Sequence, residues 1–94
     1  MKIAKHETVV QAQGNLASNM NGETVMFRIE SGKYFNLGQI GGRIWSLIES
    51  PKTVDAIVSE LTSEFDVSEE QCETQVVDFL AQLAKEQLIV VQAS

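Results

Sequence analysis

The spacing of the apolar residues changes once along this chain, and that change constrains the fold more than any other feature. In residues 23–30, ETVMFRIE, apolar side chains recur at every second position, which is the period of a β-strand. The alternation places on one face Val25, Phe27 and Ile29, and on the other Thr24, Met26, Arg28 and Glu30. Ser31-Gly32 predicts a turn, and residues 33–37 predict the returning strand of a hairpin.

From residue 40 onward the apolar residues recur at every third or fourth position, which predicts helices. The first helix is expected over Ile40–Ser50, with Trp45 beside its apolar stripe. Thr53 is a candidate N-cap for a second helix. Ser68 opens a capping box, S-E-E-Q, for a third helix that ends near Glu86. The buried side of this third helix is expected to contain Cys72, Val76, Phe79, Leu80 and Leu83.

The two ends of the chain predict further short strands. Glu7–Gln11 and Leu88–Val91 are rich in valine and isoleucine. Residues 13–22, QGNLASNMNG, indicate a turn or loop, with a weak extra strand possible at Leu16–Met20. We therefore expect an α+β fold that is winged-helix-like, with a three-stranded antiparallel sheet packed on three α-helices. Residues 1–94 are expected to form a single domain.

The charge distribution excludes one function that a winged-helix outline suggests. The net charge is −6, and residues 53–86 contain nine acidic residues and a single lysine. A recognition helix in this segment would repel the phosphate backbone, so we expect no binding to nucleic acid. The chain has no apolar run long enough to cross a membrane, and its first residues lack the apolar core of a signal peptide. We expect a cytoplasmic protein.

The residue types that carry catalytic chemistry are sparse. His6 is the only histidine, and no candidate nucleophile stands near it in the sequence. Cys72 is the only cysteine, and it falls on an apolar stripe among glutamates, which oppose thiolate formation. The chain has no ligand set typical of zinc or calcium, and the glycines at 38, 41 and 42 match no phosphate-binding motif. We expect no catalytic residue, metal or cofactor.

A strand beside a helix leaves one further possibility open. If residues 33–37 form a sheet edge, their unpaired N–H and C=O groups can accept a guest strand, and the third helix can form the opposite wall. The other interpretation is that the aromatic residues fill the core and a loop covers the edge. The residues alone do not decide between the two.

Several segments together resemble the PqqD-like family of recognition elements for ribosomally synthesised, modified peptides. The resemblance covers residues 23–91. It rests on GKYFNLGQIGGRIWSLIE, on KTVDAIVSELTSEFDVS and on a last helix that ends AQLAKEQLIVV. It implies that the leader segment of a precursor peptide binds as an added antiparallel strand between the last sheet strand and the third helix. It also implies that the domain itself catalyses nothing.

By position, the resemblance assigns a set of candidate peptide-binding residues. In the strand these are Lys33, Tyr34, Phe35, Asn36 and Leu37, and in the helix Cys72, Gln75, Val76, Phe79, Leu80 and Leu83. Apolar leader side chains are expected in pockets lined by Tyr34, Phe35, Val76 and Phe79. A free-standing chain of this size is most similar to the lasso-peptide B1 proteins.

The B1 resemblance implies partners: a leader peptidase of the cysteine-protease type and an ATP-dependent cyclase. Two alternatives remain at this stage. One is a peptide chaperone of the pyrroloquinoline-quinone pathway. The other is an acidic winged-helix adaptor that binds a protein surface and has no role in peptide maturation.

Overall fold

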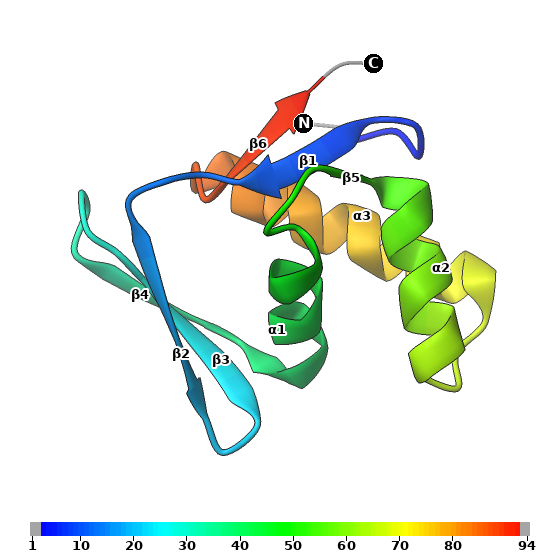
Figure 1. Ribbon diagram of the computed structural model, residues 1–94, viewed down its shortest axis with the longest axis horizontal. Helices are drawn as coiled ribbons and strands as arrows, with labels where there is room; N and C mark the ends of the chain where they lie inside the picture. Colours follow the sequence, from blue (N-terminus) through cyan, green and yellow to red (C-terminus); the bar gives the residue numbers. More distant parts are fainter. Residues whose placement is uncertain (1–2, 93–94) are drawn as a thin grey trace.

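The computed structural model describes residues 3–92, which form three helices and two three-stranded antiparallel sheets (Figure 1). The strands are β1 (Thr8–Gln11), β2 (Asn15–Met20), β3 (Glu23–Arg28), β4 (Lys33–Leu37), β5 (Lys52–Thr53) and β6 (Ile89–Gln92). The helices are α1 (Gly38–Leu47), α2 (Val54–Glu64) and α3 (Glu69–Lys85). The predicted α+β class with three helices is confirmed. No helix in the described part of the chain is long and apolar enough to span a membrane.

The first sheet joins the two ends of the described chain. Its strand order is β5-β1-β6, with Val9 paired with Val91 on one side and with Lys52 on the other. Val9 is fully buried, so this sheet supplies part of the core. The short strands expected at the two ends of the sequence are confirmed to within two residues at each boundary.

The second sheet has the order β2-β3-β4 and contains the predicted hairpin. The segment expected to be mainly turn or loop is for the most part β2, which pairs with β3 along its whole length, from Asn15–Arg28 to Met20–Glu23. The turn between β2 and β3 is formed by Asn21 and Gly22, both with positive φ. That geometry belongs to a two-residue hairpin turn whose twist matches the flanking strands. The alternative of an extra strand was therefore correct.

Helices α2 and α3 begin where the predicted caps place them. The Thr53 side chain accepts a hydrogen bond from the Ala56 N–H at 3.1 Å, and the Ser68 side chain accepts one from the Gln71 N–H at 3.2 Å. These bonds satisfy backbone donors that have no partner inside the helix. The core lies between the helices and the first sheet, where the fully buried side chains include those of Ile48, Ile57, Leu61 and Leu80.

The second sheet packs on α1 through the face that the apolar pattern did not favour. Met26 is fully buried, whereas Ile29 is 56% exposed and Val25 and Phe27 are only half-buried. The reason lies in the close approach of α1 to β3. A Cβ on Gly42 would stand 2.1 Å from the Thr24 Oγ1, so a glycine is required at this contact. The apolar residues Val25, Phe27 and Ile29 therefore lie on the outer face of the sheet.

The second sheet stands to one side of the helices, as Figure 1 shows, and two contacts position it. One is the packing of β3 on α1. The other is Arg28, whose guanidinium donates to the carbonyl oxygens of Glu86 at 2.8 Å and Gln87 at 2.9 Å. Because these two residues directly follow α3, Arg28 joins the sheet to the C-terminal end of that helix.

Candidate functional site

Strand β4 forms a free edge of the second sheet. It pairs with β3 on one side, from Val25–Asn36 to Arg28–Lys33, and no other strand among the described residues lies on its other side. That free edge is directed toward α3, because residues of both elements line a common cavity. The backbone N–H and C=O groups on such an edge can accept another strand. The geometry required for strand addition is therefore present, and no loop of the described chain fills it.

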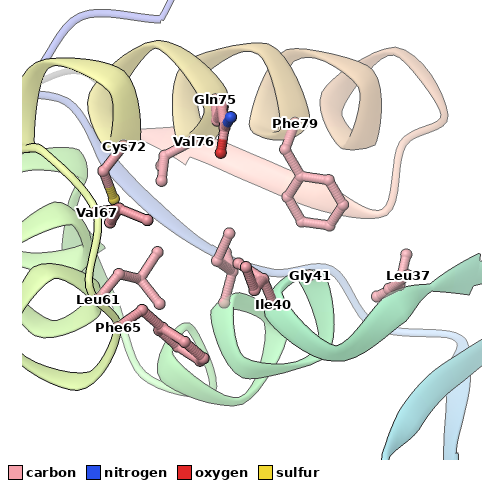
Figure 2. A pocket seen from close by; sticks show the side chains of 11 residues that line it. Leu37, Ile40, Gly41, Leu61, Phe65, Val67, Cys72, Gln75, Val76 and Phe79 are labelled. Atoms are coloured by element: carbon pink, nitrogen blue, oxygen red, sulfur yellow. The ribbon is translucent and has the colours of Figure 1, made fainter.

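An apolar cavity lies at the C-terminal end of β4, between the three helices (Figure 2). Its volume is about 250 Å³, which is large enough to hold an aromatic or branched aliphatic side chain. None of its lining residues is charged, and the one amide among them belongs to Gln75. The lining residues are Leu37, Ile40, Gly41, Ile44, Leu61, Phe65, Val67, Cys72, Gln75, Val76 and Phe79.

A second, more polar cavity lies beside the first, between β4 and the C-terminal half of α3. Its volume is about 340 Å³. It is lined by Phe35, Asn36, Leu37, Phe79, Gln82, Leu83, Lys85 and Glu86. The two cavities share Leu37 and Phe79, so together they form one groove along the β4 edge. We call this the β4–α3 groove.

Electrostatics differ between the two ends of the β4–α3 groove. The apolar cavity has no charged lining residue, but Arg43 of α1 and Glu64 of α2 form a two-bond ion pair nearby on the surface, at 2.8 and 2.7 Å. The hydrogen bond from Arg43 lowers the pKa of Glu64. At the other end, Lys85 and Glu86 place one charge of each sign beside the polar cavity.

Cys72 lies at the wall of the apolar cavity and is 5% exposed. Burial raises the pKa of its thiol above the ordinary value of 9.0. A thiol with a raised pKa is a poor nucleophile near neutral pH. The side chain therefore contributes packing surface to the cavity.

The structure brings most of the predicted site residues to the groove and leaves three outside the two cavities. The eight that line a cavity are Phe35, Asn36, Leu37, Cys72, Gln75, Val76, Phe79 and Leu83. Leu80 is fully buried beneath the helix. Lys33 is exposed at the start of β4 and lines neither cavity.

The expectation that Tyr34 lines a pocket of the groove is wrong. Tyr34 is 73% exposed and lies on the outer face of the sheet, where its ring is 4.8 Å from that of Phe27. The cause is the register of β4: Phe35 pairs with the buried Met26, so the preceding residue must face the other way.

Several groove residues were missed from the sequence. In the apolar cavity these are Ile40, Gly41, Ile44, Leu61, Phe65 and Val67, and in the polar cavity Gln82, Lys85 and Glu86. One signal could have found the last group. One face of the third helix, by its three-and-four spacing, contains Gln75, Phe79, Gln82 and Glu86. This face extends the predicted set of binding residues by one helical turn.

The side chains that could ligate a metal or act in catalysis do not form a second site among the described residues. Among residues 3–92, no three His, Cys, Asp or Glu side chains converge in a way that could hold a metal ion. His6 is exposed and lines none of the cavities described above. The groove is therefore the feature of the described chain whose geometry best fits a ligand, and its chemistry suits an extended peptide with apolar side chains.

Comparison with known proteins gives matches over most of the chain. Residues 23–89 match the family described as PqqD, coenzyme PQQ synthesis protein D. A solved structure described as "TbiB1 in Complex with the TbiA(beta) Leader Peptide" is 30% identical, covers 90% of this chain and 99% of that chain, and has a TM-score of 0.80. No curated protein matches the sequence.

A second solved structure is similar in fold. It is described as "Lasso peptide synthetase B1 complexed with the leader peptide", is 16% identical, covers 87% of this chain and 96% of that chain, and has a TM-score of 0.77. At this level of identity the likeness concerns the fold alone.

Proposed function

We propose, from the premise that this chain belongs to the PqqD family, that it binds the leader segment of a ribosomally synthesised precursor peptide. One observation carries the proposal: the free edge of β4 runs beside an uncharged apolar cavity at a position where a guest strand would reach both. The 30%-identical structure, described as a complex with a leader peptide, supports the same assignment.

The leader adds to the sheet as a strand antiparallel to β4. Its backbone pairs with the free edge, and its alternate side chains are directed toward α3. An aromatic or branched aliphatic leader residue occupies the apolar cavity near Leu37 and Phe79. A neighbouring leader residue two positions away reaches the polar cavity, where Gln82 supplies a neutral amide and Glu86 a carboxylate.

The β4–α3 groove is large enough to bind a leader peptide with a low dissociation constant. Each well-buried apolar anchor contributes roughly 1.5–3 kcal/mol. Ordering a flexible peptide and losing its translational freedom oppose binding by several kcal/mol. Two or three anchors together with strand pairing therefore give dissociation constants in roughly the micromolar to nanomolar range.

The protein acts by binding and catalyses no step in this proposal. The match of residues 23–89 to the PqqD family and the raised pKa of Cys72 support this assignment. The domain presents the bound leader to enzymes that process the precursor, namely a leader peptidase of the cysteine-protease type and an ATP-dependent cyclase. We place it in the cytoplasm, where a ribosomal product is first available.

The pathway has two candidates. A lasso-peptide pathway is favoured by the 30% identity with a B1 protein over nearly the whole chain. A pathway of the pyrroloquinoline-quinone type is the second candidate, because the matching family carries that description. The two candidates predict the same groove and differ in the leader that it accepts.

Fluorescence anisotropy of labelled peptides tests the proposal. The probes are the TbiA(beta) leader, the leader encoded by a precursor gene beside this one, and a scrambled form of each. Saturable binding of a native leader at micromolar concentration or below, lost on scrambling, supports the proposal. A folded protein that binds neither leader at several hundred micromolar, far above the expected dissociation constant, contradicts it.

A further inference from the structure

The β2-β3-β4 sheet has a second free edge, formed by β2. The sequence of this strand, NLASNM, contains no charged residue and no proline. Leu16 and Met20 are each 60% exposed, and β2 pairs with β3 alone among the described residues. Soluble proteins protect sheet edges with charges, prolines or bulges because an unprotected edge recruits another strand. This edge has none of those protections.

We propose that β2 pairs antiparallel with β2 of a second copy of this chain, across a two-fold axis that passes through Ser18. The alternation of the strand restricts the possible registers. Leu16, Ser18 and Met20 share the outer face, and only registers that pair outer with outer residues keep both sheets continuous. The register centred on Ser18 sets Leu16 of each copy opposite Met20 of the other, whereas shifts by one residue pair these side chains with Ser18.

Charge permits two copies to meet at this surface. The chain as a whole carries a net charge of −6, which opposes self-association. Within residues 15–37, however, Glu23 and Glu30 are balanced by Arg28 and Lys33. The acidic residues of α2 and α3 belong to the other half of the sequence. The sheet is therefore the part of the molecule where a second copy meets the least repulsion.

The space beside β2 fits the inner side chains of the incoming strand. A cleft of about 360 Å³ lies between β2 and α1, with Ser46 and Glu49 among its lining residues. The inner side chains that the second copy brings are those of Ala17 and Asn19, one small and one polar. Asn19 already accepts a hydrogen bond from the Gly22 N–H through its Oδ1 at 3.2 Å, which leaves the amide NH₂ to donate in the cleft.

The resulting dimer has a single six-stranded sheet. Both β4 edges lie at its two ends, so the β4–α3 groove of each copy stays open. Dimer formation therefore does not depend on leader binding, and neither process blocks the other. An interface of one short strand from each copy lies at the small end of the range for specific contacts, so the dissociation constant is expected at roughly 10–100 µM.

Sedimentation velocity over about 10–500 µM, which spans that range, is the test. The wild-type mass is expected to rise from 10.4 kDa toward twice that value. Ser18→Lys and Ser18→Glu each place like charges opposite one another and should remain monomeric, while an equal mixture of the two should recover the dimer. Ser59→Lys, the same change at an exposed position of α2, should dimerise like the wild type.

A wild-type protein that is monomeric at every concentration overturns the proposal. So does a Ser18→Lys variant that dimerises normally, or a mixture of charge variants that stays monomeric. If the charge variants do not fold, Ser18→Cys provides a second measurement. It should form a disulfide-linked dimer in air because the two residues face each other, whereas Ser59→Cys should not, and failure of Ser18→Cys to cross-link also contradicts the proposal.

Discussion

The ring of Phe79 lies directly against the backbone of Gly41. A Cβ placed on Gly41 would be 2.9 Å from Cζ and 3.1 Å from Cε1 of that ring. Because Phe79 lines both cavities, this contact sets the position of the wall that they share. A glycine in α1 therefore determines the shape of a groove whose other wall belongs to α3.

Gly41→Ala should deform the groove while the fold is kept. The new methyl group pushes the Phe79 ring toward the cavities, and the higher helix propensity of alanine, about 1 kcal/mol, offsets part of the strain in the free protein. We expect leader affinity to fall by roughly tenfold, equivalent to about 1.4 kcal/mol, with a small change in melting temperature. Anisotropy and thermal unfolding measure the two effects.

Two variants of α1 serve as controls for Gly41→Ala. Ser46→Ala, on an exposed face of the same helix, should leave affinity unchanged. Gly42→Ala should instead destabilise the fold, since its methyl group would meet Thr24 of β3. Unchanged leader affinity in Gly41→Ala would mean that the leader does not occupy the space beside Phe79.

Phe79→Ala should weaken leader binding more than it destabilises the protein. The ring is only half-buried in the free protein and would be covered further by a peptide in either cavity. We expect an affinity loss of about 1.5–3 kcal/mol, which is roughly 10- to 150-fold. Leu80→Ala is the matched comparison: Leu80 is fully buried and lines neither cavity, so its loss should appear mainly in urea unfolding. Equal affinity in a folded Phe79→Ala variant would remove this ring from the binding surface.

Strand addition predicts a pattern in the amide hydrogen exchange of β4. In an antiparallel ladder, successive residues direct their N–H groups alternately toward opposite neighbours. A bound leader should therefore slow exchange at alternate residues of Lys33–Leu37, with little change at those already paired with β3. Residue-resolved exchange by NMR measures this. A leader that is N-methylated at alternate residues should lose the protection, and protection confined to α3 would contradict strand pairing.

Arg28→Lys should loosen the end of the groove nearest the C-terminus of α3. The Arg28 side chain is 13% exposed, and it donates two hydrogen bonds to backbone carbonyls and one to the Gln87 Oε1 at 3.0 Å. A lysine cannot reproduce this fork. We expect a loss of about 1–3 kcal/mol in the free energy of unfolding, measured in urea, and weaker leader binding. Arg43→Lys, at a more exposed ion pair, should change both much less.

Cys72 should react slowly with alkylating reagents, and its pH dependence has a defined direction. Burial raises the thiol pKa, so the reactive thiolate becomes the major form only at a pH above the ordinary value of 9.0. The rate of iodoacetamide labelling, followed by mass spectrometry, should still be rising above pH 9, and a bound leader should slow it further by covering the cavity. A rate that levels off below pH 8.5 would indicate an activated thiol.

Local signals in the sequence were sufficient for the elements of the fold. Periodicity identified the hairpin and the three helices. The side chains of Thr53 and Ser68 marked the starts of two helices, through hydrogen bonds to N–H groups three residues later in the chain. Such features depend on neighbours a few residues away, which is why the sequence alone determined them. The edge position of residues 33–37 was not decided in this way, because only the strand order β2-β3-β4 shows that no described strand lies beside β4.

The tertiary structure alone decided which face of the hairpin is buried and which residues form the groove. Alternation favoured the opposite face of β3, so it could not show that Met26 is buried while Tyr34 is exposed. That choice depends on the contact between Gly42 and Thr24, 18 positions apart in sequence. The cavities likewise combine β4 with residues of α3 some 40 positions later. Contacts of this kind have no local signal, because they depend on the relative placement of whole elements.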